Sequence, residues 1–181
     1  MAKQFTALDD THRAFIERQK IFFVASAAPA GRVNLSPKGM DSLRVFSPNR
    51  VAYLDLTGSG NETSAHVEAC GRLTMMFCAF DGAPMIMRLY GRGSILRGGT
   101  TEYEALLPHF VEIFGARQIV QLDIETVQTS CGYAVPLFEH REDRHNLVRW
   151  AENKGVEGLK AYREEKNTHS IDGLPTGWTA A

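Results

Sequence analysis

The chain has 181 residues, of which 44% are hydrophobic and 23% charged, and its formal net charge is -1. This composition is typical of a soluble globular protein and argues against disordered and fibrous classes. The 20 basic residues are spread along the chain, whereas nucleic acids and anionic membranes usually bind a basic stripe. We therefore expect neither nucleic acid nor a membrane as a partner, although a small anion needs only a local site.

The N-terminal sequence and the cysteines favour a cytoplasmic protein. "MAKQFTALDDTHRAFIERQK" is charged and lacks the apolar core of a signal peptide, and no apolar run reaches the roughly 18 residues of a membrane span. Cys70, Cys78 and Cys131 are odd in number and share no CxxC spacing. We read them as free thiols in a reducing compartment, with no zinc site.

The first half of the chain predicts one helix followed by short strands and turns. Asp9 and Asp10 can cap the helix. The strands are expected at residues 21–26, 32–35, 43–46 and 51–56, separated by Pro- and Gly-containing turns. A short helix is expected at 62–68.

The second half continues with a long hairpin, residues 71–80 and 85–96, in which Gly91 and Gly93 are the expected bulges. A helix is predicted from a cap at Thr100 or Thr101 as far as Gly115. Apolar and polar residues then alternate along 118–127, which is typical of a half-buried antiparallel strand.

The last part is rich in charge and reads as a helix weakened or kinked by Gly155 and Gly158. We predict a single domain over 1–181, with an N-terminal helix in 1–20, a core in 21–135 and a C-terminal helical extension and tail in 136–181. Short strands with inserted helices indicate a mainly β fold, an antiparallel barrel with helical additions.

The stretch "LTGSGNETSAH" is a candidate anion site, because glycine and serine let backbone N–H groups approach a phosphate at the positive end of a helix. Ser59, Asn61, Thr63 and Ser64 could also donate hydrogen bonds. The alternative is an ordinary loop in which Asn61 or Ser59 caps the helix. The stretch matches neither GxxxxGK[ST] nor GxGxxG, so both interpretations stay open at this point.

Two further clusters have similar alternatives. In "VNLSPKG", Ser36 and Lys38 would suit a phosphate or the electron-rich edge of a heterocycle, but an isolated surface lysine is the simpler interpretation. Arg88 and Arg92 flank Tyr90 on one strand and could face either a groove or solvent. The histidines show no HExxH spacing and no GxSxG occurs, so neither a protein metal site nor hydrolase chemistry is supported.

Taken in order, "FFVASAAPAGRVNLSPKG", "RVFSPNRVAYLDLTGSGNETSAH", "GRLTMMFCAF" and "MRLYGRG" resemble the FMN-binding split-barrel family related to pyridoxamine 5'-phosphate oxidase. The resemblance covers roughly residues 21–96, with 118–127 as the closing strand. It implies a six-stranded antiparallel split barrel and a homodimer with FMN bound non-covalently at the subunit interface.

The resemblance also implies site residues. Those expected along the flavin are Asn34, Ser36 and Lys38, and those expected around its phosphate are Thr57, Ser59, Gly60, Asn61 and Thr63, with Arg88 or Arg92 reaching it. This chain departs from the oxidase in having Asn61-Glu62-Thr63 where the oxidase has a serine–arginine–lysine run. We expect Glu62 to point outward or to cap the backbone, because its charge would repel a phosphate.

The resulting functional prediction is a flavin-dependent oxidoreductase with an unknown small-molecule substrate and no assigned catalytic residue. Lys38 is the residue expected to tune the flavin. The alternatives are a non-catalytic flavin-binding or sensing module, a barrel that binds haem or a deazaflavin, and a barrel that binds only protein partners.

Overall fold

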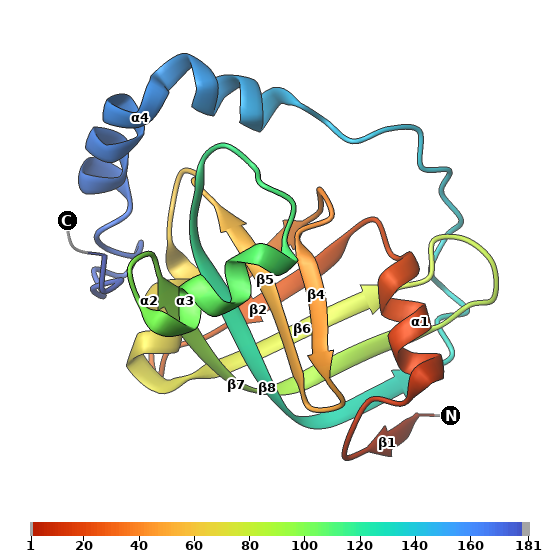
Figure 1. Ribbon diagram of the computed structural model, residues 1–181. Coiled ribbons are helices and arrows are strands. Elements are labelled where there is room, and N and C mark those ends of the chain that lie inside the picture. Colours follow the sequence, from red (N-terminus) through yellow and green to blue (C-terminus); the bar gives the residue numbers. More distant parts are fainter. Residues whose placement is uncertain (1, 179–181) are drawn as a thin grey trace.

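A single antiparallel sheet dominates the computed structural model, which describes residues 2–178 (Figure 1). Its strands are β1 (Lys3–Phe5), β2 (Phe22–Ser26), β3 (Asn34–Lys38), β4 (Leu43–Ser47), β5 (Arg50–Leu56), β6 (Arg72–Cys78), β7 (Ile86–Arg97) and β8 (Ala116–Ser130). Their order is β3-β2-β6-β7-β8-β5-β4, and β1 pairs with β8. The mainly β, antiparallel class with helical additions is confirmed.

The prediction of six strands is wrong, because the sheet has eight. The strand missed by sequence reasoning is β1, which is only three residues long and exposed throughout, so it shows no alternation of apolar and polar residues. It pairs with the far end of β8, where Phe5 lies opposite Val127. β8 itself extends to Ser130, beyond the expected end of the closing strand, and so offers β1 a partner.

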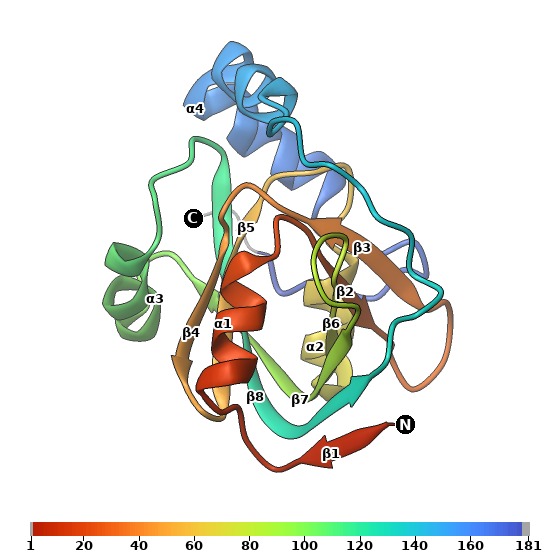
Figure 2. The same cartoon turned by 90° about the vertical axis from the view of Figure 1, so that its right-hand side faces the viewer.

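The helices are α1 (Asp10–Arg18), α2 (Glu62–Cys70), α3 (Thr101–Leu106) and α4 (Asn146–Lys166), with a 3-10 turn at Leu107–His109. Figure 2 shows α1 lying across the curved sheet beside β4 and β8. Its Phe15 and Ile16 are buried in the main core. Among the residues that the structure describes, no helix is long and apolar enough to cross a membrane.

The main core lies on the concave side of the curved sheet. Alternate residues of the long strands point into it, and those with no exposed surface are Val24, Val51, Tyr53, Met75, Phe77, Met87, Leu89, Val120, Leu122 and Val127. A smaller apolar cluster packs under α3 on the other side, around Leu54, Phe110 and Ile119. The two clusters fix β5 and β8 from both faces, and the candidate site lies where these two strands meet α2.

Two details of the second half differ from the expectation. The helix expected to reach Gly115 ends at Leu106, because Pro108 has no N–H to continue the hydrogen-bond ladder and only a single 3-10 turn follows. The sheet register shifts between Tyr90 and Gly91, but the extra residue is Glu125 on β8, so Gly91 lies opposite a bulge and does not form it. Gly93 pairs in register with Leu122 and is not a bulge either.

The chain beyond β8 leaves the sheet and then returns to it (Figure 1). Residues 131–145 form an extended arm without helix or strand. α4 follows, and Gly155 breaks its helical backbone with φ 65° and ψ 179°, as the sequence predicts. Residues 167–178 then fold back against α2 and the loop that precedes it.

Candidate functional site

A buried ion cluster lies at the end of β5. The carboxylate of Asp55 accepts a hydrogen bond from Arg117 Nε at 2.8 Å and one from Lys38 Nζ at 3.1 Å. The side chains of Asp55 and Arg117 are 3% and 5% exposed, and that of Lys38 is 23% exposed. Burial alone would raise the pKa of Asp55, but the two positive charges and their hydrogen bonds outweigh it and hold the pKa at about 2.

A sheet irregularity explains how Arg117 reaches this cluster. Asp55 lies opposite Gln118 on β8, but the next residue, Leu56, lies opposite Ala116. Arg117 is therefore the extra residue of a bulge and has no partner on β5. A bulge redirects side chains, and here it brings Arg117 and Gln118 to the same carboxylate.

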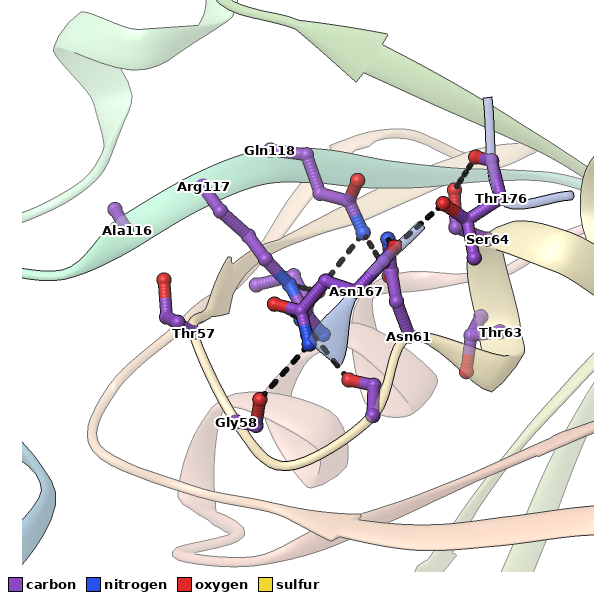
Figure 3. A network of polar contacts seen from close by, with 12 residues as sticks. Thr57, Gly58, Asn61, Thr63, Ser64, Ala116, Arg117, Gln118, Asn167 and Thr176 are labelled. Carbon is purple, nitrogen blue, oxygen red and sulfur yellow. Dashed lines mark hydrogen bonds and ion pairs between the residues drawn. The ribbon is translucent and has the colours of Figure 1, made fainter. Parts of the chain in front are cut away.

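The loop Thr57–Asn61 continues from this cluster to α2 (Figure 3). Gln118 Nε2 donates to Asp55 Oδ2 at 2.9 Å and to Asn61 Oδ1 at 2.8 Å. Asn61 Nδ2 donates in turn to the backbone carbonyl of Asn167. The Asn61 side chain is buried and engaged within the protein, and it does not cap α2.

A polar cavity of about 250 Å³ lies between β3 and this loop. Six of the predicted site residues line it, namely Asn34, Ser36, Lys38, Ser59, Gly60 and Thr63, together with Asp55 and Arg117. A second groove of about 610 Å³ shares Asn34, Ser59, Gly60 and Glu62 with it and extends toward residues 166–171. The two adjoining spaces together fall in the range of about 300–1,000 Å³ that is usual for small-molecule sites.

A larger and more apolar cavity of about 790 Å³ opens at the far end of β3, between β2 and the arm. Lys38 lines both this cavity and the polar one, and its ammonium group is bound to Asp55 in the polar one. Lys38 Nζ also lies 5.6 Å from the centre of the Tyr53 ring. Burial raises the pKa of the Tyr53 phenol well above its usual range, and the charge of Asp55 raises it further.

The structure places the other predicted residues elsewhere. Thr57 is buried behind the loop, where its hydroxyl donates to the Gly115 carbonyl and accepts from Arg163 Nε, both at 2.8 Å. Arg88 and Arg92 lie on β7 on the opposite face from the buried Met87 and do not line the polar cavity. Whether any of these residues binds a cofactor remains a prediction.

Glu62 is held by the returning chain. Both of its carboxylate oxygens accept from the backbone N–H of Ile171, at 3.0 and 3.1 Å. The acid therefore binds a backbone amide of the tail and does not cap α2, and it also lines the polar cavity.

Sequence reasoning missed four residues of the site. Asp55 had a usable signal, since it is an acid inside the otherwise apolar run "VAYLDL". Arg117 and Gln118 begin a strand whose bulge is not visible in the alternation pattern. Asn167 follows a charged helix and carries no signal, because its role depends on where the tail folds.

Comparison with known proteins bears on this arrangement. Residues 8–131 match the family described as pyridoxamine 5'-phosphate oxidase. The pyridoxamine 5'-phosphate oxidase family protein ustO of Aspergillus flavus is 40% identical over 191 residues, which cover 94% of this chain and 76% of that protein.

Solved structures share the fold at lower identity. A Lactobacillus delbrueckii protein assigned as a pyridoxamine 5'-phosphate oxidase is 17% identical with a TM-score of 0.55, covering 68% of this chain and 94% of that one. HupZ of Group A Streptococcus is 16% identical with a TM-score of 0.53, covering 67% and 98% of the two chains. The family match and the 40% identity together show that the chain belongs to the pyridoxamine 5'-phosphate oxidase family.

Proposed function

We propose that this chain is a flavoprotein of the split-barrel class that binds FMN in the polar cavity between β3 and the loop Thr57–Asn61. The observation that carries the proposal is the ion cluster in that cavity. Lys38 and Arg117 bring two positive charges beside Asp55, and Glu62, the other acid that lines the cavity, is bound to the backbone N–H of Ile171. Membership of the family supports a flavin as the ligand.

The donor set of the cavity fits a phosphorylated flavin. Lys38 has three N–H donors, one of which is directed at Asp55, so further donors are available to a ligand. The Ser59 hydroxyl is exposed on the loop, and the buried Ser36 hydroxyl makes no hydrogen bond among the described residues. The phosphate would lie at the loop and the ring system along Asn34, Ser36 and Lys38.

When bound, the flavin supplies the redox chemistry, and the residues of the chain bind and orient it. Asp55, with its pKa of about 2, remains ionised at neutral pH and holds Lys38 in place. A fixed positive charge at Lys38 would stabilise negative charge on the nearby edge of a ligand. This arrangement supports an oxidoreductase whose substrate is a small molecule of unknown identity.

The proposal includes a homodimer in the cytoplasm, with the flavin at the subunit interface. The arm exposes three large apolar side chains, those of Tyr133, Leu137 and Phe138. Exposed apolar side chains of this kind favour contact with a partner, here a second copy of the chain. Light scattering of the purified protein measures the mass directly. A monomer at micromolar concentration would contradict this part of the proposal.

An absorption spectrum and an FMN titration test the binding. We expect the bands of an oxidised flavin in the purified protein, or saturable uptake of added FMN. Replacing Lys38 by methionine removes the charge at similar length, and we expect about tenfold weaker binding, corresponding to the loss of one charge-assisted hydrogen bond. Lys3→Met on the exposed strand β1 is the matched control and should bind FMN like the wild type. A colourless protein that takes up no FMN would refute the proposal.

One observation favours a non-catalytic flavin-binding or sensing module as a second candidate. Asp55 is the most buried acid of the cavity, and a pKa of about 2 makes it a poor proton donor at neutral pH. Reduction of the loaded protein by NADH or NADPH, followed by reoxidation in air, separates the two candidates. Turnover supports the oxidoreductase, and a bound flavin that no nicotinamide reduces supports the module.

The same spectra test other ligands. A Soret band after addition of haem would show that the ligand is haem and not FMN. Selective uptake of a deazaflavin would show in the same way that the ligand is a deazaflavin. Among residues 2–178, none of the histidines lines the polar cavity, but His66 and His169 line the adjoining groove, so an axial ligand for haem would come from outside the polar cavity.

A further inference from the structure

The tail that follows α4 is fastened to the proposed FMN site through Asn167. This residue has no exposed surface although it lies only one position beyond the helix. Its Nδ2 donates to the Gly58 carbonyl at 3.1 Å, and its Oδ1 accepts from Arg117 Nη1 at 2.8 Å. One side chain thus contacts both the loop and the arginine that holds Asp55 (Figure 3).

The backbone of Asn167 is anchored as well. Its carbonyl accepts from Asn61 Nδ2 at 3.4 Å and from Thr176 Oγ1 at 2.6 Å. Thr176 is itself fully buried, and its carbonyl accepts from Ser64 Oγ in α2 and from Arg97 at the end of β7. The tail therefore forms a closed turn, residues 167–178, that is held at both ends against α2 and its preceding loop. We call this segment the strap.

The strap holds the loop that lines the polar cavity. Gly58, Ser59, Gly60 and Thr63 line this cavity together with residues of β3. The Gly58 carbonyl accepts its hydrogen bond from the strap, and the Gly60 carbonyl accepts from Arg117, which Asn167 also holds. Asp172 of the strap also pairs with Arg32, just before β3. Ligand binding costs less free energy when the contacting loop is already ordered.

We propose that the strap sets the ligand affinity of this site, with Asn167 as its positioning residue. Asn167 does not line the polar cavity, and it acts through Gly58 and Arg117. The inference rests on the proposed function for its ligand, but the fixing of the loop can be measured without any ligand.

The test compares Asn167→Ala with the wild type by FMN titration and by hydrogen exchange of the backbone amides of residues 58–61. Loss of two buried hydrogen bonds should weaken FMN binding about tenfold and speed exchange in the loop. Exchange in β6 and β7 should stay at the wild-type rate, because the apolar core holds those strands. Glu164→Ala, on an exposed position of the last turn of α4, is the control and should change neither measurement.

Asn167→Asp separates the two contacts. The carboxylate can still accept from Arg117, but it cannot donate to the Gly58 carbonyl and would repel it. We expect loop exchange as fast as in Asn167→Ala and an FMN affinity between that variant and the wild type. An aspartate variant that behaves like the wild type in both measurements would exclude the Gly58 contact as the cause.

The outcomes distinguish this inference from the proposed function. If the wild type binds no FMN, the ligand assignment fails, and exchange in the loop of Asn167→Ala still decides whether the strap holds the site. Wild-type exchange at residues 58–61 in Asn167→Ala would overturn the strap in every case. Faster exchange across the whole sheet would also overturn it, because Asn167 would then contribute only to global stability.

Discussion

The β-sheet body, residues 22–130, and the C-terminal extension, residues 131–178, are held by different interactions. The body surrounds a large apolar cluster that includes ten side chains with no exposed surface. In the described part of the extension, the buried apolar residues are Ala151 and Leu159, and the buried polar ones are Asn167, Ser170 and Thr176. The body is thus stabilised mainly by apolar burial, and the extension mainly by hydrogen bonds at its far end.

This difference separates fold from site. Apolar burial is insensitive to the direction of contacts, so it can maintain the sheet without defining any single loop. Hydrogen bonds are directional, and two of those made by Asn167 in the extension end at the loop Thr57–Asn61. Changes in the body should therefore alter global stability, and changes in the extension should alter the site locally.

The largest expected effect is in the body. Phe77→Ala removes a fully buried ring that stacks on Phe22 with centroids 5.8 Å apart, and should lower the free energy of unfolding by about 4 kcal/mol. Phe138→Ala in the arm truncates the same side chain where it is 62% exposed, and should cost about 0.5 kcal/mol or less. Urea denaturation measures both. Equal losses of unfolding free energy in the two variants would show that the arm contributes to the core.

The next effect lies at the boundary of the two regions. Asp55→Asn leaves Arg117 buried without its charged partner and should cost about 3 kcal/mol. The pKa of Asp55 falls from an ordinary value of about 3.9 to about 2 on folding, so the ionised form stabilises the protein above pH 4. That contribution should be lost as the pH falls from about 4 to 2. Denaturation curves over this pH range should show a larger loss of unfolding free energy in the wild type than in Asp55→Asn. Equal losses of unfolding free energy in the two proteins would contradict the ion cluster.

A smaller effect is expected in the strap. Thr176→Val keeps the shape of the side chain but removes the hydroxyl that donates to the Asn167 carbonyl at 2.6 Å, at a cost of about 1 kcal/mol. Amide exchange should accelerate in residues 167–178 and leave β7 unchanged. Thr168→Val next to Asn167 is the control, since its hydroxyl contacts only the exposed His169 among the described residues.

The smallest effect on the body is expected from the break in α4. Gly155 has φ 65° and interrupts the helix in a conformation that alanine disfavours, so Gly155→Ala should favour a continuous helix and raise the helix content near this position. The free energy of unfolding of the sheet should change by about 0.5 kcal/mol or less, because α4 is not part of the core of the sheet. Circular dichroism and thermal unfolding check the two statements separately. A large drop in the melting temperature would show that α4 and the sheet unfold as one unit.

Sequence reasoning succeeded where a local pattern determines the structure. Alternation located β8, the Asp9 cap began α1, and Gly155 marked the break in α4. It failed where the structure depends on distant segments. β1 forms only because β8 is long enough to pair with it. The early end of α3, in contrast, follows from a local signal that was overlooked, Pro108.

The site divides in the same way. The residues of β3 and of the glycine-containing loop could be named from their order along the chain, and six of them line one cavity. Arg117 reaches that cavity only through a bulge, and Asn167 only through the return of the tail. Neither event leaves a pattern in the local sequence, because each is decided by the partner that the residue meets after folding.

The position of the strap along the chain has a consequence for biosynthesis. Protein chains emerge from the ribosome N-terminus first, and their domains generally begin to fold in that order. All eight strands of the sheet precede Asn167 in the sequence, so the sheet can assemble before the strap has been made. The loop Thr57–Asn61 then waits for more than a hundred later residues to be synthesised before Asn167 can reach Gly58. The ligand site is accordingly completed last, and a chain interrupted after β8 would have a folded sheet with an unfinished site.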